Sequence, residues 1–320
     1  MRKMHEPTRV AITGLGAITP SGADAASTWE HLVAGRSGVT VVDEPWAADL
    51  PVRIAGQVAR RERVLRSCAR FARGDPELLL GLDPERPWPA DRLLALLACR
   101  CGVSPDPAHR HGPDTLDPEL TVRALDALAA VLARTAAAKG TVLTGTGHPG
   151  PLLGFYAGLA EALGGAGCSV PTPARGRAFP AHAPEGARRC VLDYVRRVGV
   201  VRVYEGTPPN GAPRSVGPGA EPLSEPVHTH SPQPVRIALA ALAEAGQPRP
   251  DLVIGDHGWI CGAGRLGVPA VGPADADDPA VFVAEAEGQV AVAVPLDDGA
   301  RPECYGMLTA YVLQQAGMSQ

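Results

Sequence analysis

Apolar residues recur at two different periods along this chain, and the period changes near residue 140. From about Arg60 to Lys139 the spacing is helical, most clearly in "DRLLALLACRCG" and "ELTVRALDALAAVLARTAAAKG", and a glycine ends each run. Short β-branched runs follow, namely "TVLTGTG", "CSVPTP", "VVRVYEG", "DLVIGDHG", "PAVGPA" and "VAVAVPLDD". Apolar helical segments such as "LLGFYAGLAEALGGAG" and "QPVRIALAALAEAG" lie between them.

Strands that alternate with helices favour a parallel sheet with both faces covered. We therefore predict an α/β protein, with a Rossmann-like, mainly parallel sheet over residues 140–320 and a helical cap region over residues 58–139. Nearer the start, residues 8–19 predict a strand and a turn. The run "DAASTWEHLVAG" then predicts a helix that ends before Gly35.

Composition excludes several classes of function. The 320 residues carry a formal net charge of -4, and no basic stripe interleaved with aromatic residues suggests nucleic-acid binding. No apolar run approaches the roughly 20 residues that span a bilayer, so we expect no membrane association and a cytoplasmic location. The seven cysteines are odd in number and scattered, which argues against a disulfide framework.

The turn "TGHPGPLLG" leads from a predicted strand into an apolar helix. Backbone N–H groups at such a helix start, together with the helix dipole, favour an anion. We therefore predict that Thr146, Gly147 and His148 bind substrate. A glycine-rich turn with a purely structural role is the alternative.

Two later turns occupy equivalent places at strand ends or helix starts. The segment "HTHSPQPVR" places His230 and Ser231 before a helix, and "DLVIGDHGW" ends a strand on Asp256 and His257. Ligands of open α/β sheets bind beyond the carboxyl ends of the strands, so we expect these turns to face one crevice. Ser231 and Asp256 could instead be simple helix caps.

Carboxylates follow two further strands. "VGPADADDPAVFVAEAEG" places Asp275 and Asp278 at a strand end, where carboxylate oxygens suit a hard cation such as Mg²⁺. Turn and cap chemistry is the alternative, because Asp-Pro pairs open helices. Asp297 and Asp298 also follow a strand, but the glycine beside them indicates a plain turn.

Two resemblances cover the chain. "RVAITGLGAITPSGADAASTWEHLVAGRSGV", continuing into "WAADLPVRIAG", resembles the amino-terminal end of a β-ketoacyl-acyl-carrier-protein synthase, and it defines residues 1–57 as a ketosynthase-like fragment. The family's nucleophilic cysteine motif is absent, and Glu205 stands where its His-Gly-Thr turn has a histidine. Condensation chemistry is therefore not expected, and the resemblance leaves a contact with an acyl carrier protein as the role of this segment.

The second resemblance extends over residues 53–320. The motifs "RIAGQVA", "RHGPDTLDPELTV", "GTGHPGPLL", "HTHSPQPVR", "PDLVIGDHGW" and "DDPAVFVAEAEG" occur in the order of an actinobacterial phosphatase family. The resemblance implies a phosphate-ester hydrolase and adds Asp114 to the substrate-binding residues. The chain departs from the family in an arginine-rich stretch after "RIAGQVA", at Asp277 and at Cys261.

Together these patterns predict a phosphoric monoester hydrolase that acts on a small phosphorylated metabolite with a divalent metal, Mg²⁺. The predicted catalytic residues are Asp256, His257 and His230, with a histidine as acid or base, and the predicted metal ligands are Asp256, Asp275 and Asp278. Direct attack of Asp256 on phosphorus stays open. Two other functions also stay open: a non-catalytic protein that binds a phosphorylated ligand, and a carrier-protein-associated factor of polyketide or fatty-acid biosynthesis.

Overall fold

The sheet organises the larger of two units in this computed structural model, which describes residues 19–21, 25–41, 54–56, 60–109, 115–183, 186–203 and 224–318. The units comprise residues 1–63 and 64–320. In the smaller one, helix α1 (Ala25–Val33) is followed by strands β1 (Val39–Val41) and β2 (Ile54–Gly56), which pair antiparallel. The helix expected there is present, and most of the strand expected over residues 8–19 lies outside the described residues.

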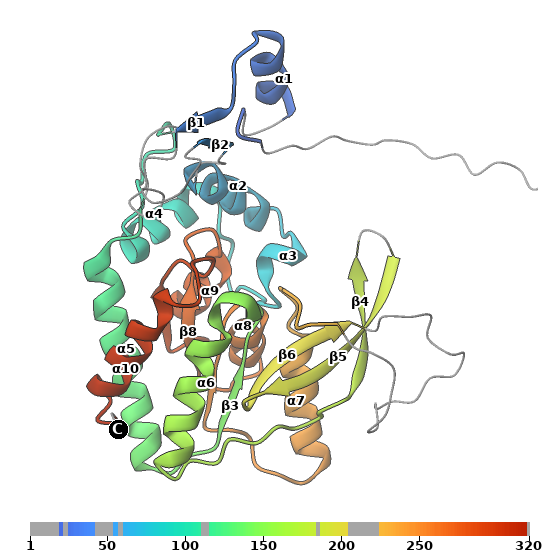
Figure 1. The fold of residues 1–320 in the computed structure, drawn as a ribbon, viewed down its shortest axis with the longest axis vertical. Helices are drawn as coiled ribbons and strands as arrows, with labels where there is room; N and C mark the ends of the chain where they lie inside the picture. Colours follow the sequence, from blue (N-terminus) through green and yellow to red (C-terminus); the bar gives the residue numbers. More distant parts are fainter. Residues whose placement is uncertain are drawn as a thin grey trace, which may run out of the picture. The chain divides into compact units, whose positions relative to one another are not determined.

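The larger unit contains a seven-stranded sheet in the order β4-β5-β6-β3-β7-β8-β9 (Figure 1). The strands are β3 (Val142–Gly145), β4 (Ala178–Ala183), β5 (Gly186–Val195), β6 (Val198–Val203), β7 (Leu252–Ile254), β8 (Ala270–Ala274) and β9 (Val292–Pro295). The ladders from β6 through β3, β7 and β8 to β9 are parallel, whereas β4 and β5 pair antiparallel with their neighbours. The predicted α/β class with a mainly parallel sheet is confirmed.

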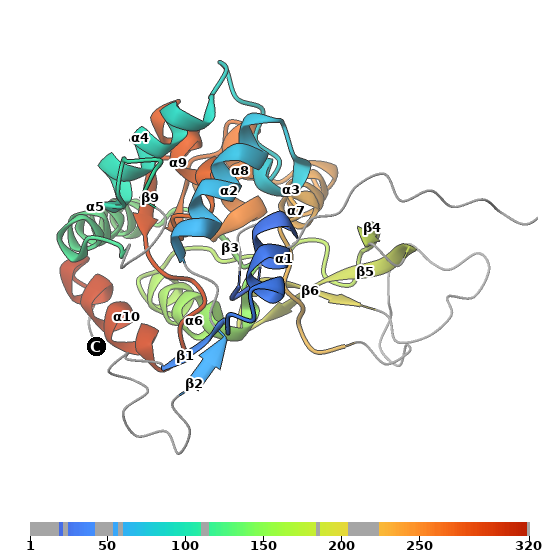
Figure 2. The same ribbon diagram turned by 90° about the horizontal axis from the view of Figure 1, so that it is seen from above.

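Helices cover both faces of this sheet (Figure 2). They are α2 (Arg60–Ala72), α3 (Pro76–Leu79), α4 (Ala90–Cys101), α5 (Pro118–Ala137), α6 (Pro149–Gly165), α7 (Gln233–Glu244), α8 (His257–Arg265), α9 (Pro279–Ala286) and α10 (Cys304–Gln315). Among the described residues, no helix combines the length and the apolar character needed to cross a membrane.

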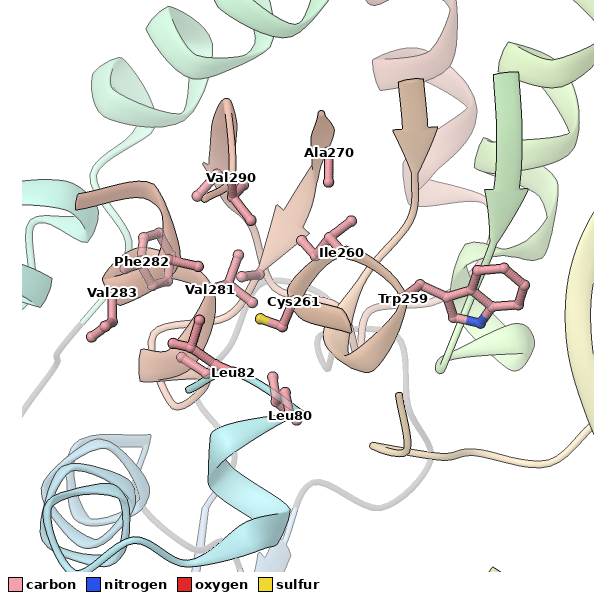
Figure 3. Packing of buried hydrophobic residues seen from close by; sticks show 14 of the residues in the cluster. Leu80, Leu82, Trp259, Ile260, Cys261, Ala270, Val281, Phe282, Val283 and Val290 are labelled. Carbon is pink, nitrogen blue, oxygen red and sulfur yellow. The ribbon is translucent and has the colours of Figure 1, made fainter. Parts of the chain in front are cut away.

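Two hydrophobic cores form because successive strand residues point to opposite faces. In β7, Val253 joins the core that contains α4, α7, α8 and α9, whereas Leu252 and Ile254 join the core that contains α5, α6 and α10. Figure 3 shows part of the first core, where α8 and α9 pack against Leu80 and Leu82. Helices α4 and α5 of the predicted cap region thus pack into different cores, and the domain boundaries at residues 57 and 139 stay predictions.

Two local expectations need correction. "CSVPTP" is not a strand: Ser169 makes one isolated bridge to Thr141, because Pro171 and Pro173 have no N–H to donate to a ladder. The β4–β5 pair was not predicted, although Cys190, Leu192 and Tyr194 are buried at alternate positions of β5, as a strand pattern requires.

Trp259 anchors the start of α8 beneath the loops that follow β3 and β7. It is 1% exposed, and its indole points toward β3 (Figure 3). A Cβ atom added at Gly145 or Gly199 would collide with the indole, and one at Gly255 would meet the Trp259 Cβ, so two glycines form the space that the indole fills.

We therefore expect Gly199→Ala to lower the free energy of unfolding by about 1–3 kcal/mol, because the new methyl group overpacks the indole. Thermal unfolding of the full chain measures the change. Gly154→Ala is the matched control, since this exposed glycine of α6 has no atom within 4 Å of an added Cβ, and a gain of about 0.4–1 kcal/mol is expected there. Equal stability of Gly199→Ala and the wild type would contradict the packing described.

Candidate functional site

Loops that follow the parallel strands come together at the carboxyl edge of the sheet, together with the segment before α7. The Thr229 N–H donates to the Gly147 carbonyl over 2.9 Å and so joins the β3 loop to that segment. The residues that this edge gathers are Thr146, Gly147 and His148 after β3, Asp256 and His257 after β7, Asp275 and Asp278 after β8, Asp297 and Asp298 after β9, and His228 and His230 before α7.

Four imidazole rings lie against one another there. The ring centroids of His148 and His228 are 4.2 Å apart and nearly stacked, those of His148 and His257 are 4.3 Å apart, and those of His230 and His257 are 4.5 Å apart. Burial, and then the neighbouring histidines, lower the pKa of His228 to about 4. Burial and His257 also lower the pKa of His230. These two rings are therefore neutral at pH 7 and carry a lone pair for a proton or a metal ion.

The tautomer of His230 follows from its one backbone partner. Its Nδ1 lies 3.2 Å from the Glu77 carbonyl oxygen at α3. A carbonyl can only accept, so Nδ1 carries the proton and Nε2 presents the lone pair. Metal-binding histidines are commonly oriented by such a bond from the other ring nitrogen.

His257 differs from its neighbours because carboxylates surround it. Its Nε2 lies 3.0 Å from Asp278 Oδ2 and 3.3 Å from Asp298 Oδ2, and its Nδ1 lies 3.5 Å from Asp256 Oδ1. Burial alone would lower the pKa of His257, but these three acids together raise it well above its usual value. The same histidine, with His148, holds the pKa of Asp298 below its usual range despite burial.

Asp256 connects the loops after β7 and β3. Its carboxylate is fully buried and accepts hydrogen bonds from the Thr146 hydroxyl, over 2.6 Å, and from the Gly147 N–H. The Thr146 oxygen in turn accepts the His148 N–H over 2.9 Å. Both oxygens of Asp256 therefore help to fix the loop that carries His148, and one of them also lies beside His257. The metal-binding and nucleophilic roles expected of Asp256 stay predictions, and this geometry favours a positioning role.

The backbone is adapted to this close arrangement at two positions. His257 has a φ of 42°, in the left-handed region that a residue with a side chain rarely adopts, and such conformations typically cost about 1–3 kcal/mol. Opposite it, a Cβ atom at Gly147 would meet the Thr229 carbonyl oxygen and His257 Nδ1. Only glycine allows the two loops to approach this closely.

Three groups of side chains place their ligand atoms within 4.8 Å of one another. They are His148, His228 and His257; His230, His257 and Asp278; and Asp275, Asp297 and Asp298. Three buried atoms of these residues, His148 Nδ1, His257 Nδ1 and Asp298 Oδ2, make no hydrogen bond of good geometry, although His148 Nδ1 and Asp298 Oδ2 lie 3.2 Å apart. Buried polar atoms are normally satisfied, so the donor set fits a bound metal ion.

The structure describes three of the four remaining predicted site residues, Thr146, Ser231 and Asp275. The Ser231 hydroxyl accepts the Gln233 N–H over 3.2 Å and so caps the start of α7. The Thr146 hydroxyl is buried and engaged by Asp256. Asp275 Oδ1 accepts the Ala276 N–H over 2.6 Å, and Asp114 lies outside the described residues. The substrate-binding roles of Thr146, Ser231 and Asp114 stay predictions.

Sequence reasoning left three contributors out of the predicted site residues, His228, Asp297 and Asp298, although it noted that both aspartates follow a strand. His228 lies two residues before His230, and both aspartates follow β9, so the strand-end rule that selected Asp256 and Asp275 could have found them. Gly299 does form the expected turn, since its N–H donates to Asp297 Oδ1 over 2.9 Å. That turn nevertheless directs Asp298 toward the histidines.

Comparison with known proteins assigns this unit to a family. A family model described as phosphatase matches residues 47–320, a range that includes every residue of the site. The chain belongs to this phosphatase family. A phosphatase of Streptomyces coelicolor is 41% identical to it over 269 residues, which are 83% of this chain and 92% of the relative. No solved structure matches the chain.

The start of the chain matches a second family. The model for the N-terminal domain of beta-ketoacyl synthases matches residues 7–79. A polyketide beta-ketoacyl synthase of Streptomyces halstedii is 40% identical over 55 residues, and 3-oxoacyl-[acyl-carrier-protein] synthase 2 of Coxiella burnetii is 42% identical over 53 residues. Each match covers 17% of this chain but only 13% of the synthase. Both predicted resemblances are confirmed.

The bonding of Asp256 leads to a prediction about Asp256→Asn. An asparagine oxygen can accept one of the two hydrogen bonds, and its NH₂ group then faces a donor. We expect a loss of about 1–3 kcal/mol in the free energy of unfolding and a lower pKa of His257, because a negative charge beside it is removed. Urea unfolding and NMR titration measure the two effects.

Asp91→Asn, at an exposed position in the first turn of α4, is the control and should change stability by at most about 1 kcal/mol. If Asp256→Asn behaved like this control in both measurements, Asp256 would not position His257.

Proposed function

We propose that this chain is a metal-dependent phosphatase that hydrolyses a phosphoric monoester of a small metabolite. The observation that supports this most is the buried centre around His257, where three carboxylates surround one imidazolium and several ligand atoms make no hydrogen bond of good geometry. Membership of the phosphatase family supports the reaction class.

Charge balance supports the metal. Asp256, Asp278 and Asp298 carry three negative charges against the single positive charge of His257. Buried charge is costly unless it is compensated, so this centre favours a further cation of charge two. His230, His257 and Asp278 would hold it, with the ion displacing the proton of His257, and His228 lies outside this group. Imidazole ligands suit Fe²⁺ or Zn²⁺ better than the Mg²⁺ expected from the sequence.

The phosphate would bind where four helices begin. Helices α6, α7, α8 and α9 start directly beyond His148, Ser231, Asp256 and Asp278, at the edge that carries the histidines. Helix N-termini carry partial positive charge and favour anions. The arrangement therefore combines a cation site with positive helix ends, as phosphoryl transfer requires.

Charge neutralisation, proton transfer and positioning can each be assigned to particular groups at this centre. A divalent ion bound there would neutralise charge on the phosphoryl oxygens. His228, which is neutral, can accept a proton from the attacking water and return one to the leaving alcohol. His257, 1% exposed and held by three acids, keeps the centre assembled, and Asp256 fixes its orientation.

Metal removal tests this proposal. Wild-type protein assayed on p-nitrophenyl phosphate and a panel of phosphorylated metabolites should lose its activity after chelation with EDTA. Added Fe²⁺ or Zn²⁺ should restore it better than Mg²⁺. Full activity after verified removal of all metal would contradict the metal dependence. Binding of phosphate esters without turnover by the metal-loaded protein would favour the non-catalytic alternative.

His228→Ala should lower kcat by about 10²–10⁴-fold on the same substrates, since it removes the proposed acid and base. His31→Ala, in α1 and outside the residues matched by the phosphatase family, is the matched control and should leave kcat unchanged. A folded His228→Ala protein with wild-type kcat would assign proton transfer to another group.

A further inference from the structure

Asp298 lies between two groups of metal ligands. Its Oδ2 is 3.2 Å from His148 Nδ1 and 3.3 Å from His257 Nε2, which belong to the histidine groups. The same carboxylate has an oxygen within 4.8 Å of ligand atoms of Asp275 and Asp297. Asp298 is 7% exposed, and although both imidazole nitrogens are within reach of its Oδ2, neither makes a hydrogen bond of good geometry to it. One buried carboxylate is thus shared by a histidine-rich group and an all-carboxylate group.

A second buried polar atom near Asp298, on helix α6, also lacks a hydrogen bond of good geometry. The Tyr156 hydroxyl of α6 is fully buried and lies within reach of Asp256, but it makes no hydrogen bond of good geometry. The pKa of Tyr156 is raised first by burial and then by the charges of Asp256 and Asp298, which places the hydroxyl close to both acids. A neutral hydroxyl cannot balance the charge of carboxylates, and unsatisfied buried polar atoms commonly mark an ion or water that belongs to the site.

The two groups differ in chemistry. Histidine nitrogens suit transition ions, whereas three carboxylate oxygens suit a hard ion such as Mg²⁺ or Mn²⁺. Three acids with ligand atoms within 4.8 Å also repel one another, and Asp275 and Asp298 are 3% and 7% exposed, so little water screens them. A second divalent ion bound by all three carboxylates would offset this repulsion, because each carboxylate would then contact a positive charge.

We propose that the centre binds two divalent cations, one held by the histidines and one by Asp275, Asp297 and Asp298, with Asp298 bridging them. This inference rests on the proposed metal-dependent function. Two ions that share a carboxylate can hold the attacking and leaving oxygens of one phosphoryl group. The carboxylate site takes a hard cation, which gives the predicted Mg²⁺ a place distinct from the histidines.

Counting bound Mn²⁺ tests the proposal, because Mn²⁺ suits the carboxylates and, supplied in excess, also occupies a site with nitrogen ligands despite its low place in the affinity order. Full-length protein stripped of metal is dialysed against excess Mn²⁺, and metal per chain is measured by mass spectrometry. Electron paramagnetic resonance detects magnetic coupling between neighbouring ions. We expect two coupled Mn²⁺ ions per wild-type chain and one uncoupled ion in Asp297→Asn. An asparagine oxygen there can still accept the Gly299 N–H, so the turn should persist.

Asp277→Asn is the matched control, because it makes the same change in the β8 loop outside the three ligand groups, and it should keep both ions. Asp275→Asn serves as a second variant if Asp297→Asn fails to fold by circular dichroism. Two coupled ions in either folded variant would overturn the carboxylate site. One ion in the wild type with metal-dependent phosphatase activity would overturn the second site alone. No bound ion in the wild type would overturn the proposed function as well.

Discussion

The carboxylate of Asp256 is the interaction on which the site depends. It joins the loops of two neighbouring parallel strands by accepting from Thr146 and Gly147 at full burial. From the same residue the chain turns through the left-handed conformation of His257 into α8, and the Trp259 indole, packed against Gly145 and Gly199, holds that helix start in place. The conformational strain at His257 is sustained because the loops and the indole on both sides fix it.

Electrostatics explains why these groups are gathered in one place. His257 alone faces three aspartates, while the neighbouring His228 and His230 are kept neutral by burial and by one another. The centre therefore has negative charge to neutralise and imidazole lone pairs to donate. Four helix starts at the same edge favour an anion. A bound cation would neutralise the carboxylates and accept the imidazole lone pairs, and a bound phosphate ester would supply the anion that the helix starts favour.

Much of this arrangement follows from the sequence. The strands β3, β7, β8 and β9 are short apolar runs that end on polar turns, and parallel strands direct those turns to one edge, so the meeting of His148, His257 and Asp275 was predictable. The pairing of His257 with Asp278 and Asp298 was not, because these contacts join residues 21 and 41 positions apart and depend on the left-handed backbone at His257. Likewise, the glycine after Asp298 indicated a turn correctly but gave no sign of where the aspartate points.

The most direct measurement of the central claim is the position of the metal itself. Crystals soaked in MnCl₂, with diffraction recorded for anomalous scattering of manganese, would locate each ion independently of activity. The account predicts a strong peak about 2 Å from imidazole nitrogens of the His230, His257 and Asp278 group, at the usual metal–nitrogen distance. Well-ordered side chains at this centre with no peak between them, in crystals that bind Mn²⁺ only at exposed surface residues, would contradict it.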